Sequence, residues 1–197
     1  MSCTAITICQ PYAHLIVTPQ AELPSNCVQK RVENRTWATH YRGELLIHAG
    51  KSTKYMDHDD AARYPSMVFG AVIGIARLVD CLRFEQRRDR YGKGLYQPTA
   101  YDSRRYPWLT SHPHAEGPFA WILSDVRRLI EPVAMAGHQG FWKVEDARLV
   151  DQIKTLTLVP SLNFSQRGTT ATSDEHRRED WGSAVAVRRP TAEESQP

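Results

Sequence analysis

The chain has 197 residues, 41% of them hydrophobic and 24% charged, which allows one packed domain of ordinary size, alone or with a tail. No apolar run approaches the roughly 20 residues of a membrane span and no basic signal-peptide region opens the chain, so we expect a cytoplasmic protein without membrane contact. The net charge is +3, and because residues 160–197 carry five Arg and six Asp or Glu, residues 1–159 carry +4. This mildly basic character is compatible with a nucleic-acid partner.

The first predicted elements are a strand and a helix. Residues 4–9 contain β-branched side chains and predict a short strand. Gln10-Pro11-Tyr12-Ala13 then opens a short helix, because proline fits a first turn, where its missing N–H has no partner to lose. Residues 18–28 contain two prolines and read as a loop.

The most informative segment is Lys30-Arg31-Val32-Glu33-Asn34-Arg35-Thr36-Trp37. It alternates like a strand, and one face carries Glu33, Arg35 and Trp37. A carboxylate, a guanidinium and an indole on one face favour a strand that lines a pocket. A solvated edge strand with an exposed ion pair is the alternative. Lys30 lies three residues before Glu33, so it reaches the same cleft only from the turn before the strand or from a bulge.

The remaining pattern predicts further short strands and two peripheral helices. The strand at 69–82 contains Gly70 and Gly74, which favour a sharply curved path. Short, curved strands with few helices predict a mixed α/β, mainly β fold, a small β-barrel of five to six strands. The other expected elements are strands at 44–49, 119–124 and, as the last, 140–144, with an acidic helix within 53–65 and a packing helix at 145–157.

Two segments fall outside this pattern. Residues 83–116 lack clear periodicity and hold seven Arg or Lys against four acidic residues, interleaved with five Tyr or Trp. A loop of this length is expected to be functional or disordered. Residues 159–197 contain few apolar side chains, and we expect a disordered C-terminal tail after a domain over 1–158.

Together these segments resemble the ASCH domain, a relative of the PUA fold, over roughly residues 4–144. The resemblance implies a five- or six-stranded, PUA-like β-barrel with a cleft lined by the Lys-x-x-Glu-x-Arg strand and the start of the first helix. The segments that carry it are Gln10-Pro11-Tyr12-Ala13, Lys30 to Trp37, Tyr41-Arg42-Gly43, the strand Gly70–Leu82, Gly117-Pro118-Phe119-Ala120-Trp121 and Gly140-Phe141-Trp142.

The resemblance also implies a function, binding of RNA or other nucleic acid, including a modified nucleoside within it. One bacterial branch of the family hydrolyses N4-acetylcytidine, and ribonuclease activity is attributed to another member. A hydrolase of either type is therefore the alternative, and a protein-interaction adaptor of the coactivator type, resting on the tail, is the second alternative. Glu33 stands where the amidohydrolase branch has a threonine.

The binding hypothesis gives each side chain a role. Glu33 would accept hydrogen bonds from an exocyclic amino group, Lys30 and Arg35 would meet a phosphate or a base carbonyl, and an aromatic ring would stack on the base. The alternative is an internal Glu33–Arg35 ion pair with Trp37 in the core. The full set of binding candidates is Gln10, Pro11, Tyr12, Lys30, Glu33, Arg35, Trp37 and Arg42, with Arg87, Arg88, Arg90 and Lys93 as candidates for contact with the nucleic-acid backbone.

The catalytic hypothesis uses Lys30 as a base and Glu33 to activate water, since the segment contains no serine or cysteine. No cofactor is expected. His112-Pro113-His114 and the four cysteines show no ligand set of known spacing, so no metal is expected either.

Overall fold

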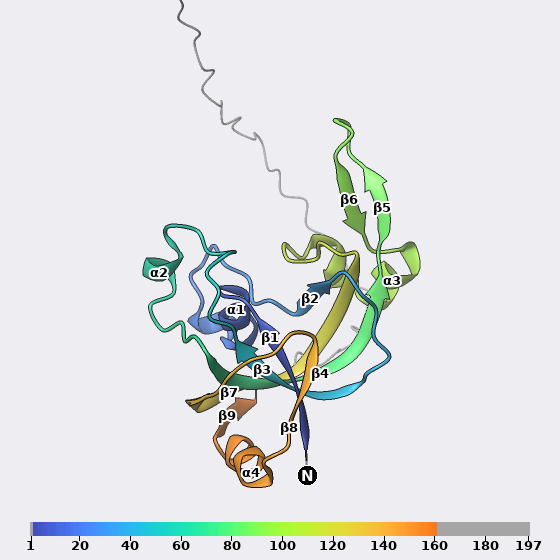
Figure 1. Cartoon of the computed structure of the whole chain (residues 1–197). Helices are drawn as coiled ribbons and strands as arrows, with labels where there is room; N and C mark the ends of the chain where they lie inside the picture. Colours follow the sequence, from blue (N-terminus) through green and yellow to red (C-terminus); the bar gives the residue numbers. More distant parts are fainter. Residues whose placement is uncertain (1, 161–197) are drawn as a thin grey trace, which may run out of the picture. The chain divides into compact units, whose positions relative to one another are not determined.

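A computed structural model of the chain describes residues 2–160 and shows a mainly β fold with short helices (Figure 1). A mixed sheet of seven strands has the order β2-β7-β4-β3-β1-β8, and β9 pairs with β7 off this path. All neighbours are antiparallel except β1 and β3, which run parallel. The strands of this sheet are β1 (Cys3–Ile8), β2 (Val32–Arg35), β3 (Gly43–Ala49), β4 (Ala71–Arg83), β7 (Phe119–Ala134), β8 (Phe141–Val144) and β9 (Thr157–Pro160).

Both faces of the sheet are covered, which explains why β1 is apolar at successive positions. Ile6 and Ile8 join a core cluster with residues of helix α1 (Tyr12–Val17). Ala5, on the opposite face, joins a second cluster with Val150 and Ile153 of helix α4 (Ala147–Thr155). The two helices therefore pack on opposite sides of one sheet, as the period of two along a strand requires.

Strand β4 is irregular, as its glycines indicate. Its pairing with β7 shifts register at three points, one of them between Val72 and Gly74. A Cβ placed on Gly74 would lie 2.5 Å from Cγ1 of Val17 and 2.9 Å from the carbonyl oxygen of Arg127. Only glycine therefore lets helix α1 approach this strand so closely.

The prediction of a closed barrel is wrong, whereas the mixed, mainly β class is confirmed. Strands β2 and β8 end the hydrogen-bonded path, and no described strand pairs them with each other. Aromatic side chains that follow β2 pack against β8 instead. The ring centroid of Phe141 in β8 lies 5.3 Å from that of Trp37 and 5.2 Å from that of Tyr41. Side-chain packing replaces the backbone ladder that closure requires.

The segment 83–116 is an ordered insert rather than one long loop. Its strands β5 (Glu85–Arg88) and β6 (Gly94–Gln97) form a separate two-stranded sheet that projects from the rest of the domain (Figure 1). Helix α3 (Ala100–Arg105) and the 3-10 helix η2 (Pro107–Ser111) follow. Thr99 and Asp102 form a reciprocal capping box at the start of α3, so this turn is specified locally.

Two other predicted boundaries change. The acidic helix expected within 53–65 is reduced to α2 (Asp60–Arg63), and the loop 18–28 contains the 3-10 helix η1 (Gln20–Glu22). The strand at 140–144 is not the last, because β9 follows α4 and ends at Pro160. The predicted tail therefore overlaps the sheet by two residues, and the remainder of it lies outside the described residues.

Candidate functional site

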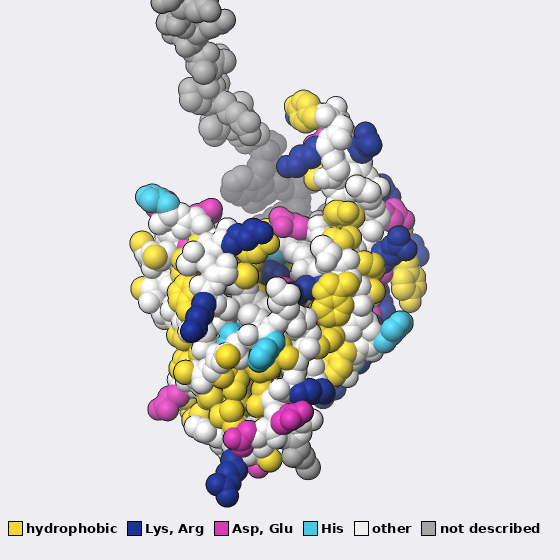
Figure 2. All heavy atoms as spheres, viewed as in Figure 1, with side chains coloured by type: hydrophobic (Ala, Val, Ile, Leu, Met, Phe, Trp, Pro, Cys, Tyr) yellow, Lys and Arg dark blue, Asp and Glu magenta, His cyan; other side chains and the backbone are white. Residues whose placement is uncertain are grey.

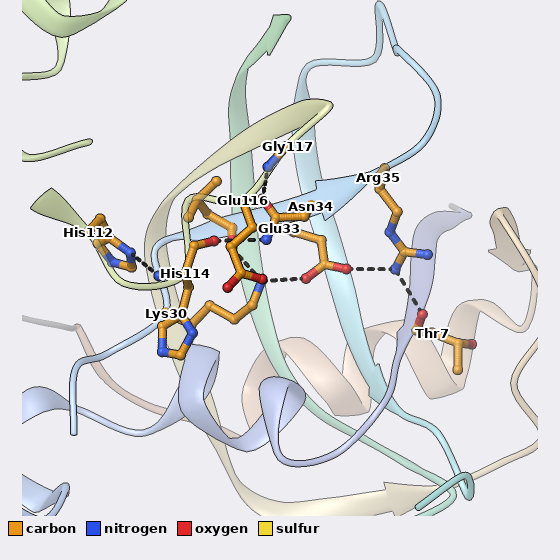
Figure 3. A network of polar contacts seen from close by, with 10 residues as sticks. Thr7, Lys30, Glu33, Asn34, Arg35, His112, His114, Glu116 and Gly117 are labelled. Carbon is orange, nitrogen blue, oxygen red and sulfur yellow. Dashed lines mark hydrogen bonds and ion pairs between the residues drawn. The ribbon is translucent and has the colours of Figure 1, made fainter. Parts of the chain in front are cut away.

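Strand β2 places the charged segment as its spacing predicted. Lys30 lies just before the strand, and its Nζ is 2.8 Å from Oε2 of Glu33 (Figure 3). The Nη2 of Arg35 is 3.0 Å from the other carboxylate oxygen, Oε1. One carboxylate is thus held between two cations.

This charged group is buried, unlike a solvated pair at a sheet edge. Lys30 is 2% exposed and Glu33 is 7% exposed. The Lys30 ammonium also donates to the carbonyl oxygen of Val32, and Nη2 of Arg35 donates to the carbonyl oxygen of Thr7 at 3.0 Å. Buried charges are costly unless paired and hydrogen-bonded. The charged ends of Lys30 and Glu33 meet that condition, whereas the Nε of Arg35 is buried without a hydrogen-bond partner among the described residues, and the group carries one positive charge in excess.

A cavity of about 270 Å³ lies beside this group, near the small end of the range for small-molecule pockets. Tyr12 forms part of its wall, with its ring centroid 5.4 Å from Nζ of Lys30 and 6.0 Å from the ring of Tyr55. The surface is hollowed between α2 and the β5–β6 hairpin (Figure 2). The lining residues are Thr7, Ile8, Cys9, Tyr12, Lys30, Glu33, Asn34, Arg35, Tyr55, His114 and Glu116.

Asn34 attaches the wall opposite α1 to strand β2. Its Nδ2 donates to the carbonyl oxygen of His114 at 2.8 Å, and its Oδ1 accepts from the backbone N–H groups of Glu116 and Gly117, both at 3.2 Å (Figure 3). Asn34 therefore fixes His114 and Glu116 relative to Glu33 and Arg35. The site combines β2 with a loop about eighty residues further along the chain.

The walls of the cavity are uncharged near neutral pH, apart from the carboxylate of Glu116 at the rim. Burial lowers the pKa of His112 to about 4. Burial, with the charge of Lys30 adding to it, also lowers the pKa of His114. Burial and the nearby carboxylate of Glu116 raise the pKa of Tyr12. Two neutral rings, Tyr12 and His114, therefore face a charged floor, with centroids 6.1 Å apart.

Two candidates from the sequence, Gln10 and Pro11, support the site without reaching it. Gln10 is fully buried, its Nε2 donates to the carbonyl oxygen of Val68 at 2.7 Å, and its Oε1 accepts from the N–H of His14 at 2.9 Å. Pro11 is the N-cap residue of α1 and is also buried. These residues hold the start of α1, which in turn presents Tyr12 to the cavity.

Two further candidates, Trp37 and Arg42, lie outside the cavity. The Trp37 ring packs edge-on against Trp121 with centroids 4.6 Å apart, so it belongs to the edge of the core. Arg42 pairs with Asp80 of β4 at 3.1 Å, and neither residue lines the cavity. For Trp37 the structure matches the alternative of a core position, and the internal Glu33–Arg35 ion pair of the same alternative is also present.

The four basic candidates of the insert lie on the β5–β6 hairpin and its turn, and all are exposed: Arg87, Arg88, Arg90 and Lys93. The cavity also contains residues that no sequence pattern indicated, namely Thr7, Ile8, Cys9, Asn34, Tyr55, His114 and Glu116. Tyr55 comes from the segment expected to hold the acidic helix and His114 from the segment without clear periodicity, and only the fold places them beside β2.

No family model matches the chain, and no characterised protein with a similar sequence was found. Within residues 2–160, no helix is both long enough and apolar enough to cross a membrane. The same part of the chain contains no cluster of three or more His, Cys, Asp or Glu side chains placed to hold a metal ion.

Proposed function

We propose that this chain is an ASCH-type domain that binds RNA, or a modified nucleoside within it, in the cavity beside β2. The observation that carries the proposal is the Lys30–Glu33–Arg35 group, with Lys30 and Glu33 buried and Arg35 partly buried, at the floor of a cavity with aromatic walls. A nucleobase needs both features, because its faces are apolar and its edges carry donors and acceptors.

The floor offers complementary hydrogen-bonding groups to the edge of a base. Each carboxylate oxygen of Glu33 has one cationic partner and retains a lone pair that can accept from an exocyclic amino group. Arg35 uses Nη2 for both of its contacts, so within the described residues its Nη1 makes no hydrogen bond and is left for a carbonyl or ring nitrogen. Acceptor and donor side by side match the amino and carbonyl groups of cytosine or a related base.

The walls offer a stacking surface. The Tyr12 ring stands over the charged floor, and the more exposed Tyr55 ring extends the same wall towards solvent. Stacking of a base on such a ring is worth about 1–3 kcal/mol. This term depends little on the base, so selectivity would come from Glu33 and Arg35.

The test compares two arginines of the same sequence segment. Arg35→Gln should weaken binding of labelled single-stranded RNA about 10- to 100-fold, the loss expected for about 1.5–3 kcal/mol of charge-assisted hydrogen bonding. Arg42→Gln is the matched control, because Arg42 pairs with Asp80 away from the cavity. Equal affinity of the two folded variants would remove the cavity from the proposal.

A second candidate function, hydrolysis of an acylated cytidine or of RNA, is favoured by the direct contact between the Lys30 ammonium and Glu33 in the cavity. Glu33 would accept a proton from the attacking water, and the Lys30 ammonium would donate a proton to the leaving group, so Lys30 would act as an acid in this arrangement rather than as the base expected from the sequence. Incubation of the protein with N4-acetylcytidine and a panel of RNAs, followed by separation of products, tests it. Turnover that is abolished in a Glu33→Gln variant shown to remain folded would support it, and absence of product at high protein concentration would exclude it.

The adaptor alternative rests on residues 159–197, most of which lie outside the described residues. It stays a prediction of the sequence.

A further inference from the structure

The β5–β6 hairpin begins at the rim of the cavity. The N–H of Phe84 donates to the carbonyl oxygen of Pro118 at 2.9 Å, which joins the base of the hairpin to the loop behind Glu116. A Cβ on Gly117 would lie 2.7 Å from the Cβ of Tyr96, so glycine lets this loop pack directly on β6. The position of the hairpin relative to the cavity is therefore set by packing rather than by a free linker.

The hairpin presents cations to solvent. Arg87 pairs with Glu85 at 3.0 Å, and the carboxylate of Asp89 accepts from the backbone N–H groups of Tyr91 and Lys93 in the turn. Three other cations form no ion pair within the described residues, namely Arg88, Arg90 and Lys93. Nothing in the fold of the domain requires three unpaired cations on one projecting ribbon.

Exposed aromatic rings lie beside Arg or Lys side chains both at the tip of the hairpin and at the mouth of the cavity. Tyr91 at the hairpin tip is 78% exposed, and the guanidinium carbon of Arg90 lies 4.7 Å from its ring centroid. At the mouth of the cavity Tyr55 is 51% exposed, and Nζ of Lys54 lies 5.2 Å from its ring. Exposed rings combined with Arg or Lys are typical of surfaces that follow a nucleic-acid strand. The side of the mouth near α2 carries Asp57 as well as Lys54, and the hairpin side carries the Glu116 carboxylate as well as the three unpaired cations, so the excess of positive charge lies further out, on the hairpin itself.

From these observations we infer that the nucleotide in the cavity belongs to a longer strand, whose backbone leaves the cavity along the β5–β6 hairpin. The inference rests on the proposed function and narrows its ligand from a nucleoside to a polynucleotide. Arg88, Arg90 and Lys93 contact phosphates, and Tyr91 contacts the face of a base several nucleotides from the one in the cavity.

The length of the hairpin determines how many nucleotides of the bound nucleic-acid strand can lie beside it. Four strand residues at about 3.3 Å each extend about 13 Å, and phosphates spaced by about 3.4 Å along a stacked strand place about four of them beside the hairpin. Affinity should therefore rise as the probe is lengthened by about four nucleotides on one side of the bound base, and then level off. Extension on the other side should add less.

The experiment measures the binding of labelled oligocytidylates at about 50 and 200 mM salt. The probes range from the mononucleotide to about eight nucleotides, which is twice the number of nucleotides predicted to lie along the hairpin. The triple variant Arg88→Gln, Arg90→Gln, Lys93→Gln should lower the slope of log affinity against log salt by about 2, at about 0.7 per lost contact. It should bind the mononucleotide as the unmodified chain does. Arg148→Gln, which removes an exposed cation from α4, is the control for the loss of a surface cation outside the hairpin and should change the salt slope little.

The results separate this inference from the function on which it rests. If the mononucleotide binds as tightly as the longest probe, or if the triple variant keeps the full salt slope, the inference is wrong while the cavity proposal stands. If Arg35→Gln leaves binding of every probe unchanged, the cavity proposal is wrong and the inference falls with it. Parallel arms with DNA strands and with duplexes identify the form of backbone that the hairpin follows.

Discussion

The buried Lys30–Glu33 pair predicts a large and specific loss of stability when its carboxylate is neutralised. In Glu33→Gln the Lys30 ammonium, 2% exposed, keeps its position next to the Val32 carbonyl but loses its counter-charge. Removing one partner of a buried ion pair typically costs about 3–5 kcal/mol. We expect Glu33→Gln to lower the free energy of unfolding by about that amount.

Other substitutions in the same group should cost less. In Lys30→Met the carboxylate keeps Arg35 at 3.0 Å, so the expected loss is about 1–3 kcal/mol. The double variant Lys30→Met, Glu33→Gln no longer contains the unpaired Lys30 ammonium, and only the partly exposed Arg35 is left without a carboxylate partner, so the double variant should be more stable than Glu33→Gln alone. A coupling energy of about 0.5–3 kcal/mol is expected from this cycle.

Equilibrium unfolding in urea, followed by tryptophan fluorescence, measures all three values, provided that the slope with denaturant is unchanged. Glu22→Gln is the control, because it breaks the exposed pair with Arg128, for which a change below about 1 kcal/mol is expected. The reasoning is refuted if Glu33→Gln costs no more than this control. It is also refuted if the costs of the two single variants simply add.

Three further predictions follow from the structure. Burial lowers the pKa of His112 from 6.5 to about 4, so as the pH falls the unfolded chain takes up a proton at this residue before the folded chain does. The contribution of His112 to stability should therefore be complete above pH 6.5 and decline towards about pH 4. In urea titrations at different pH values, His112→Asn should flatten this decline. Gly74→Ala should lower the thermal midpoint of unfolding because its Cβ would meet Val17, whereas Gly94→Ala, with only a side-chain amide at 3.4 Å, should not. Asn34→Ala should cost about 1–3 kcal/mol and increase amide hydrogen exchange across residues 112–117, whose backbone it holds.

The parts of the fold that could be predicted from the sequence are those in which a local pattern coincides with burial. The strand at 4–9 and the strand at 44–49 are buried on both faces, and their apolar runs carry that signal. If Lys30 and Glu33 share a cleft, strand geometry leaves two options for Lys30, the turn before β2 or a bulge, because a spacing of three cannot bring two side chains of a regular strand to one face, and the structure has the first. These arguments need no knowledge of distant contacts.

The parts that could not be predicted depend on contacts between distant segments. The hairpin at 85–97 is exposed on nearly every residue, so it carries no hydrophobic alternation from which a strand could be recognised. Strand β7 continues to Ala134 through a polar stretch that is held by pairing with β4 and β9. The closed barrel was wrong because β2 and β8 do not pair, and Trp37, read as a pocket residue, instead packs on Phe141 of β8.

The candidate site shows the same division between local and distant information. Glu33 and Arg35 lie two residues apart, so one strand is enough to place them together. Asn34, which lies between Glu33 and Arg35 in the sequence, binds the loop that brings His114 and Glu116 to the cavity. Within the four residues of β2, Glu33 and Arg35 contribute to the charged floor, and Asn34 between them positions the far wall. That arrangement explains why three consecutive residues of β2 are polar although Glu33 is buried. Within β2, Val32 provides core packing, and the three residues that follow build the cavity.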